Sequence, residues 1–177
     1  MIVSPLEIEG LWRLHSAPSR DERGAFSRLW CEGDFAAAGL PFRPVQVSLS
    51  ENPKAGTLRG LHWQAEPHGE TKLVRVLRGR IFDVLVDVRP GQPTFGHHVC
   101  LEMQAGDGVL APPGVAHGFL SLTPDVLLVY AMDRDYAPAA ARGLRYDDPA
   151  LGIAWPLAPQ IIGPRDLAWP DFATLCD

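Results

Sequence analysis

The pattern that most constrains the fold is a run of strict alternation in residues 81–89, IFDVLVDVR. A β-strand directs successive side chains to opposite faces, so alternate residues share a face. One face of this segment consists of Ile81, Asp83, Leu85 and Asp87, and the other of Phe82, Val84, Val86 and Val88. The pattern predicts a strand.

Further short segments of this kind follow one another from residue 45 onward. They cover 45–50, 72–77, 97–103, 108–114, 117–122 and 126–132, with a tight turn over 78–80. Seventeen glycines and seventeen prolines in 177 residues supply many turns between them. This spacing is typical of an antiparallel β-sandwich or barrel rather than a helical bundle. A short helix is predicted over 32–38, ending on Gly39, and loops or short helical turns are predicted from Asp147 onward.

No internal repeat or linker divides the chain, so residues 1–177 are expected to form one domain. The net charge of −5 and the pI near 5.6 disfavour nucleic-acid binding. No apolar run reaches the length of a membrane helix, and no export signal is visible at the N-terminus. Three cysteines without a C-x-x-C pair favour a reduced, cytoplasmic protein. These cysteines are Cys31, Cys100 and Cys176.

Two segments carry histidines in patterns that suggest a site. The first, TLRGLHWQ, contains His62, and the second, GDGVLAPPGVAHGF, contains His117. The second segment has the spacing G-x5-P-x-G-x2-H, formed by Gly106, Pro112, Gly114 and His117. It resembles the second signature of the cupin superfamily, whose fold is a small jelly roll. The first cupin signature is degraded here, but a metal site of His62, Glu70 and His117 stays open as an alternative, as do two purely structural histidines.

Matching segments over residues 21–166 resemble the dTDP-4-dehydrorhamnose 3,5-epimerase family, metal-free cupins that epimerise nucleotide-linked 4-keto sugars. The segments include DERGAF, VQVSLS, TLRGLHWQ, ETKLVRVLRGRIFDVLVDVR, PPGVAHGF, RGLRYDDPALGIAWP and PRD. The resemblance implies a cupin-type jelly roll, all-β and mainly antiparallel, with short helical extensions at the termini. It further implies an isomerase without cofactor or metal, and a homodimer that commonly forms through an exchanged strand.

The resemblance also implies catalytic roles. A ketone at C4 acidifies the protons on C3 and C5, so inversion needs a base on one face and an acid on the other. His62 matches the base and Asp166 the carboxylate that orients it. Tyr130 matches the acid, and Lys72 matches a cation beside the enolate oxygen, where negative charge develops.

A second group of residues matches the substrate-binding positions of the family. The implied set is Arg23, Arg28, Gln46, Ser48, Arg59, His117, Tyr136 and Arg165. Arg23 and Arg59 match the diphosphate contacts, with Gln46 beside them, and guanidinium groups suit phosphate oxygens. His117 lines the sugar pocket in the family, and Tyr136 is expected nearby.

The chain departs from the family pattern on the nucleotide side. Arg28 and Ala141 each stand where the family usually has Glu. Ser48 replaces Asn, Arg165 replaces Lys, and Ala131 stands where a Lys is common. One hypothesis is that the chemistry is retained on a different nucleotide or sugar, and the alternative is neutral drift at an exposed rim.

The sequence therefore predicts 3,5-epimerisation of a nucleotide-diphosphate 4-keto-6-deoxyhexose. Three alternatives stay open at this point. The first is a single-centre epimerase that acts at C3 or C5 on a differently linked sugar. The others are a metal-dependent cupin enzyme and an inactive sugar-nucleotide-binding module.

Overall fold

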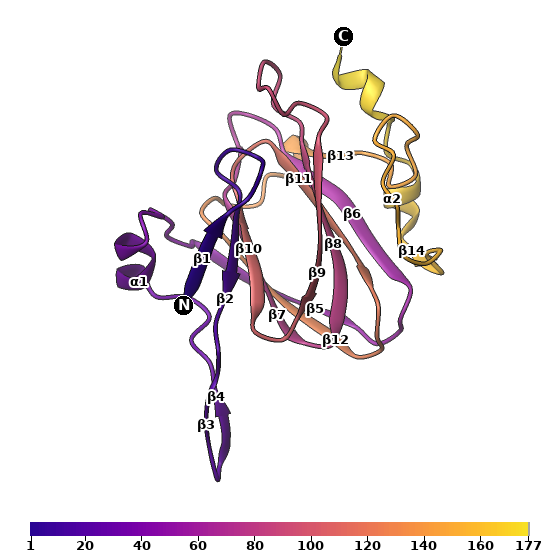
Figure 1. Ribbon diagram of the computed structural model, residues 1–177. Coiled ribbons are helices and arrows are strands. Elements are labelled where there is room, and N and C mark those ends of the chain that lie inside the picture. The colour runs from indigo at the N-terminus through magenta and orange to yellow at the C-terminus, as the bar shows by residue number, and fades with distance from the viewer. Residues whose placement is uncertain (177) are drawn as a thin grey trace.

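The computed structural model describes residues 1–176, and two antiparallel β-sheets packed face to face form its body (Figure 1). The first sheet has the order β1 (Ile2–Pro5), β2 (Trp12–His15), β10 (Asp107–Ala111), β7 (Lys72–Arg78), β12 (Val126–Met132) and β5 (Gln46–Asn52). The second has the order β13 (Ala141–Gly143), β6 (Thr57–Gln64), β11 (Val115–Ser121), β8 (Arg80–Asp87) and β9 (His98–Gln104). A short strand, β14 (Ile161–Ile162), pairs parallel to β6. The jelly roll expected from the sequence is confirmed.

Both faces of β8 are buried, which explains its apolar character. Ile81 and Leu85 enter the core between the two sheets, together with Phe119 of β11. Val84 and Val86 face outward and are covered by the C-terminal segment. That segment lies against the second sheet (Figure 1), and it contains α2 (Pro164–Leu167) and a 3-10 turn, Phe172–Leu175. The short helical turns predicted for the tail are confirmed.

Part of the outer face of the first sheet is covered by residues 30–42. The predicted helix is present as α1 (Glu32–Ala37), and Gly39 follows it with a φ of 73°. Phe35 of this helix is completely buried and packs with Phe42 and Leu73. A second 3-10 turn, Pro138–Ala140, precedes β13. None of the helices formed by residues 1–176 combines the length and apolar character of a membrane span.

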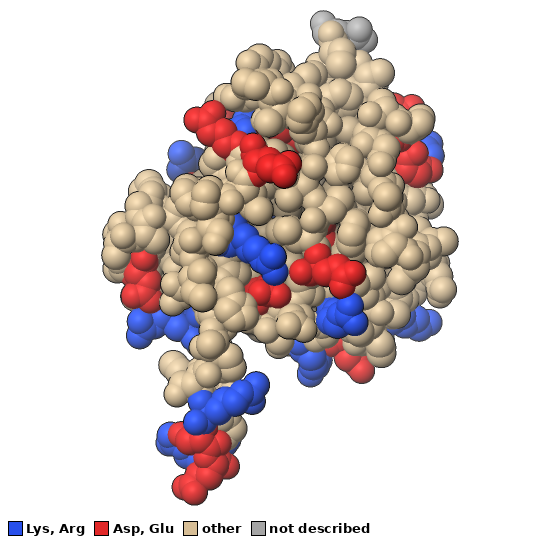
Figure 2. Space-filling model, viewed as in Figure 1, with Lys and Arg blue, Asp and Glu red and all other residues tan. Residues whose placement is uncertain are grey.

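One hairpin stands clear of the sheets. It consists of β3 (Ser19–Asp21) and β4 (Gly24–Phe26), and every residue of both strands is exposed. Figures 1 and 2 show it projecting from the body, with acidic and basic side chains gathered on it. The hairpin buries none of its own side chains within this chain.

The histidine-bearing segment TLRGLHWQ forms the strand β6 (Thr57–Gln64), which the alternation of apolar residues does not predict. Two glycines allow it to lie unusually close to β11. Gly60 has a φ of 137°, and a Cβ placed there would collide with the Cα of Gly118. This close approach brings His62 directly opposite His117 in the register of the two strands.

Candidate active site

A cavity with two adjoining lobes opens between the sheets. Both lobes are lined by the same four residues, His62, Lys72, Tyr130 and Asp166. The β5-side lobe, of about 460 Å³, also contains Ser48, Leu49, Ser50, Glu51, Arg59 and His117. The tail-side lobe, of about 300 Å³, also contains Trp63, Gln64, Glu70, Met132, Tyr136, Ala141, Arg142, Arg165 and Trp169. The four shared residues therefore occupy the junction of the cavity.

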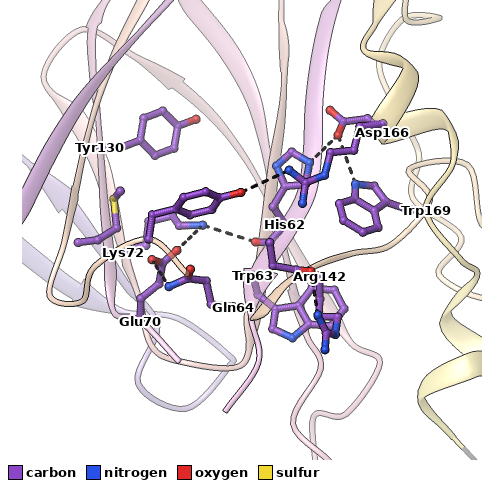
Figure 3. A pocket seen from close by; sticks show the side chains of 13 residues that line it. His62, Trp63, Gln64, Glu70, Lys72, Tyr130, Arg142, Asp166 and Trp169 are labelled. Atoms are coloured by element: carbon purple, nitrogen blue, oxygen red, sulfur yellow. Dashed lines mark hydrogen bonds and ion pairs between the residues drawn. The ribbon is translucent and has the colours of Figure 1, made fainter. Parts of the chain in front are cut away.

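His62 and Asp166 form a hydrogen-bonded pair at this junction. The Nε2 atom of His62, on β6, lies 2.6 Å from Oδ1 of Asp166, which belongs to α2 (Figure 3). The backbone N–H of Gly60 donates to Oδ2 at 3.2 Å, and the indole of Trp169 donates to Oδ1 at 3.3 Å. Burial acts to raise the pKa of Asp166, but the hydrogen bond and charge of His62 and the two other donors hold it below its usual value. An ionised Asp166 accepts the Nε2 proton and leaves Nδ1 of the imidazole as the basic nitrogen.

Tyr130 enters the cavity from the opposite sheet. It belongs to β12 and packs edge-on against His117, with the ring centroids 5.8 Å apart. Burial, followed by the nearby carboxylate of Asp83, raises the pKa of Tyr130 well above its ordinary value. The phenol consequently stays protonated at neutral pH and is suited to donate a proton.

Lys72 begins β7 and places its ammonium group inside the cavity. Its Nζ lies 3.3 Å from Oε1 of Glu70 and 3.5 Å from the backbone oxygen of His62 (Figure 3). Burial lowers the pKa of Lys72, while the carboxylates of Glu70 and Asp83 act in the opposite direction. The site thus contains a buried cation close to the His62 strand.

A second imidazole–carboxylate pair lies deeper in the β5-side lobe. Nε2 of His117 is 2.7 Å from Oδ1 of Asp83, and both side chains are almost completely buried. Burial raises the pKa of Asp83, although His117 and Lys72 oppose the effect. The pair fixes the orientation of His117 toward the cavity that it lines.

Each lobe also presents a guanidinium group. The Nε atom of Arg59 donates to Oδ1 of Asn52 at 2.8 Å, which fixes the arginine while leaving its terminal nitrogens available. In the tail-side lobe, Arg165 lies over the ring of Trp169, 4.8 Å from its centroid, and its Nη1 is 3.4 Å from the hydroxyl of Tyr136. The cavity is therefore suited to an anionic ligand.

Nine of the twelve site residues proposed from the sequence line this cavity. They are His62, Lys72, Tyr130, Asp166, Ser48, Arg59, His117, Tyr136 and Arg165. The remaining three do not reach it within the chain. Arg23 lies on the projecting hairpin and pairs with Asp21, and Arg28 pairs with Asp34. Gln46 donates to the backbone oxygen of Arg134 at 2.8 Å.

The three candidate metal ligands point to different partners. His62 pairs with Asp166, Glu70 with Lys72, and His117 with Asp83. Within residues 1–176, no group of three or more His, Cys, Asp or Glu side chains is arranged to hold a metal ion. The ligand set needed for the metal-dependent alternative is therefore not assembled.

Several lining residues were not identified from the sequence. Gln64, Arg142 and Trp169 belong to the tail-side lobe, yet no motif marks them individually. Trp169 is placed by Gly143, where a Cβ would collide with the indole ring. This contact joins residues that are distant in the sequence, and hydrophobic periodicity carries no information about it.

A model of the family described as dTDP-4-dehydrorhamnose 3,5-epimerase matches residues 5–174 of this chain. The chain belongs to this family. The dTDP-4-dehydrorhamnose 3,5-epimerase of Sinorhizobium fredii is 40% identical over 162 residues, which cover 88% of this chain and 81% of that protein. The dTDP-4-dehydro-6-deoxyglucose 3-epimerase of Streptomyces bikiniensis is 39% identical over 176 residues, covering 96% of this chain and 88% of that protein.

A solved structure gives the same result for the fold. The dTDP-4-dehydrorhamnose 3,5-epimerase of Bacillus anthracis, crystallised with TDP and PPi bound, superposes with a TM-score of 0.92 at 32% identity. The match covers 96% of this chain and 98% of that one. This member of the dTDP-4-dehydrorhamnose 3,5-epimerase family is thus a cupin-type jelly roll and an isomerase of the epimerase class.

Proposed function

We propose that this protein inverts C3 and C5 of a nucleotide-diphosphate-linked 4-keto-6-deoxyhexose, without a cofactor, by proton transfer through His62 and Tyr130. The carrying observation is the position of these two groups at the junction of the cavity. They come from β6 and β12 of opposing sheets, with Lys72 at the same junction. Relatives named as 3,5-epimerases and as 3-epimerases support the reaction class.

Each inversion requires two proton transfers. Nδ1 of His62 removes the proton from the carbon next to the ketone, and the C–H electron pair forms an enolate with its charge on the C4 oxygen. The ammonium group of Lys72 stabilises that charge. The hydroxyl of Tyr130 then protonates the same carbon from the opposite face. One inversion leaves an imidazolium and a phenolate, and exchange with solvent restores both groups.

We propose that the diphosphate binds to guanidinium groups of the cavity. Arg59 is held in the β5-side lobe by Asn52, and Arg165 is held in the tail-side lobe by Trp169 and Tyr136. Ala141 lines this second lobe as well. Three of the departures from the family pattern, at 48, 141 and 165, therefore lie inside the cavity, where a changed side chain acts directly on the bound ligand.

The protein is also proposed to act as a homodimer whose hairpin, β3–β4, completes the cavity of a second copy. Two observations support this arrangement. Phe26, on the hairpin, has 76% of its surface exposed. The edge strand β5 and the residue before it present Val45, Val47 and Leu49 to solvent, with exposures of 60%, 66% and 56%. An exposed apolar edge of this kind is typical of a surface that pairs with another chain.

Proton NMR in D₂O tests the chemistry directly. Incubation with dTDP-4-keto-6-deoxyglucose is expected to remove both the C3 and the C5 proton signals, and His62→Ala is expected to abolish the loss. Exchange at one carbon only contradicts the two-centre assignment. If the dTDP sugar gives no exchange, GDP-, UDP- and CDP-linked 4-keto sugars test whether the departures at 48, 141 and 165 changed the nucleotide. The absence of exchange with all four contradicts the epimerase proposal.

A mixing experiment tests the shared site. The variants Arg23→Ala and His62→Ala are each expected to be nearly inactive. If Arg23 acts on the partner's cavity, mixed dimers contain one site without either substitution, and activity reappears when the two variants are exchanged. The control is a protein that carries both Arg23→Ala and His62→Ala, taken through the same exchange procedure alone, and it is expected to stay inactive. No recovery after confirmed subunit exchange contradicts the arrangement, and so does a monomeric mass in light scattering.

A further inference from the structure

Glu70 forms the direct ion pair of Lys72, and both side chains are largely withdrawn from solvent. Their exposed fractions are 9% and 12%, and Oε1 of Glu70 lies 3.3 Å from Nζ of Lys72. Glu70 belongs to the segment between β6 and β7, so it approaches the lysine from outside the two strands. A buried ammonium group without such a partner loses its proton readily, because burial penalises the charged form.

The other oxygen of Glu70 is fixed by Gln64, a buried residue of β6. Nε2 of Gln64 lies 3.0 Å from Oε2 of Glu70, so each carboxylate oxygen has a separate partner. The same amide nitrogen lies within 3.2 Å of the backbone oxygens of His68 and Asp135. Oε1 of Gln64 accepts a hydrogen bond from the backbone N–H of Ala137 at 2.6 Å. Gln64 therefore ties the segment that carries Glu70 to the segment that carries Tyr136.

We propose that Glu70 is a positioning residue of the reaction, which keeps Lys72 charged and directed at the developing enolate, with Gln64 fixing the carboxylate. This inference rests on the proposed function, in which Lys72 stabilises the enolate. It assigns to Glu70 a role distinct from the metal ligation considered from the sequence. Figure 3 shows the continuous connection from Gln64 through Glu70 to Lys72.

The role involves a balance of two electrostatic effects. The carboxylate favours the ammonium form of Lys72, and at the same distance it offsets part of the positive charge available to the enolate. Several other ionisable groups surround Lys72. Those that line the cavity are Glu51 on β5, His62 and Arg59 on β6, His117 on β11, Tyr130 on β12, Tyr136, Arg142 on β13, and Arg165 and Asp166 on α2, and Asp83 on β8 acts on Lys72 from outside the lining. Of these, Asp83 is the carboxylate that also favours the charged lysine.

The decisive variant is Glu70→Gln, which keeps the shape of the side chain and removes its charge. We expect the basic limb of the pH–rate profile to move to lower pH by about 1–3 units, the usual effect of losing an adjacent opposite charge. The acidic limb is expected to keep its position. Glu70→Asp keeps the charge and is expected to restore most of the basic limb. Glu66→Gln, an exposed position in the same segment, is the matched control and is expected to leave the profile unchanged.

A second measurement examines Lys72 without relying on turnover. The chain has two lysines, Lys54 and Lys72, so acetic anhydride labelling followed by mass spectrometry compares them within one sample. At a pH where Lys72 of the unaltered protein is largely protonated, Glu70→Gln is expected to label it about tenfold to thousandfold faster relative to exposed Lys54.

The outcomes separate the two proposals. If the unaltered protein exchanges no substrate protons, the proposed function fails, while the labelling ratio still reports on the ion pair. If Glu70→Gln lowers the rate equally at every pH and leaves the labelling ratio unchanged, Glu70 is only structural and the inference is overturned. An unchanged profile with an unchanged ratio overturns it as well.

Discussion

Replacing Asp166 by Asn is expected to disable the base while leaving the fold largely intact. Three donors converge on this carboxylate, from His62, Gly60 and Trp169. Asn has one acceptor oxygen and one NH₂ group in the same positions. If its oxygen accepts from Gly60, the NH₂ group faces Nε2 of His62 and favours the tautomer whose proton is on Nδ1. That tautomer has no lone pair where the substrate proton must be accepted.

The magnitude follows from the two arrangements available to the substituted amide. Turning the amide so that its oxygen faces His62 leaves the buried N–H of Gly60 against a donor, at a cost of about 1–3 kcal/mol. The opposite orientation sets the NH₂ group against the indole N–H of Trp169, which costs less because that donor is only part-buried and its bond is the longest of the three. The wrong tautomer is then favoured, and loss of a general base contributes a factor of about 10²–10⁴. We therefore expect deuterium exchange at C3 and C5 to slow by about 10²–10⁴, which corresponds to about 3–5 kcal/mol in the barrier.

The assay is the initial rate of deuterium incorporation, measured beside a thermal melt of the same protein. Trp169→Phe removes only the longest of the three hydrogen bonds and keeps the carboxylate, so it is expected to lose less than tenfold. The reasoning is refuted if Asp166→Asn is folded and retains more than a tenth of the original rate. It is also refuted if Trp169→Phe and Asp166→Asn lose activity to the same extent.

Three further predictions concern other parts of the molecule. Tyr130→Phe is expected to lower epimer formation about 100-fold or more while His62 still exchanges substrate protons, so NMR in D₂O finds deuterium in sugar that has not been inverted. An equal loss of epimer formation and of deuterium incorporation contradicts the assignment of Tyr130 as the acid. Gly143→Ala places a Cβ against the indole of Trp169 and is expected to destabilise the fold by about 1–3 kcal/mol, lowering the melting temperature. Burial acts to raise the pKa of Asp87, but hydrogen bonds from Arg89 and Thr94 hold it below its usual value. The stability that this carboxylate contributes is complete above its unfolded pKa of about 4 and is lost as pH falls through the lower pKa of the folded state. Urea titrations are therefore expected to give Asp87→Asn a smaller free energy of unfolding than the unaltered protein at pH 7, and the difference is expected to shrink below pH 4. A difference that stays constant with pH contradicts this prediction.

Local patterns predicted the strands β5 and β7 to β12, the helix α1 and the helical turns of the tail, but not β1 to β4, β6, β13 or β14. The alternation in 81–89 fixes β8, and the residues that end on Gly39 fix α1 because glycine adopts the positive φ found there. Asp83 lies on the same face as Ile81 and Leu85, as the alternation requires. The pattern shows which face this carboxylate shares, but its pairing with His117 depends on the neighbouring strand.

The residues that the sequence did not mark, or that do not reach the cavity within one chain, depend on distant contacts. Gln64 is held by hydrogen bonds to the backbone oxygens of His68 and Asp135, and no short motif encodes that arrangement. Arg23 and Arg28 were expected beside the substrate, yet within one chain they pair with Asp21 and Asp34. The surroundings of an arginine on a projecting hairpin depend on the surface that the hairpin contacts, and a single sequence does not contain that information.

The placement of Asp166 in the C-terminal segment has a consequence for how activity is lost. The sandwich contains His62, the proposed base, but the carboxylate that pairs with it belongs to a layer packed on the outer surface. A transient detachment of that layer would break the hydrogen bond between His62 and Asp166 while the two sheets and the core between them stay folded. Inactivation by mild heat or denaturant is therefore expected to be a local event that precedes melting, and stabilising the docked segment is expected to extend the working range without changing the reacting groups.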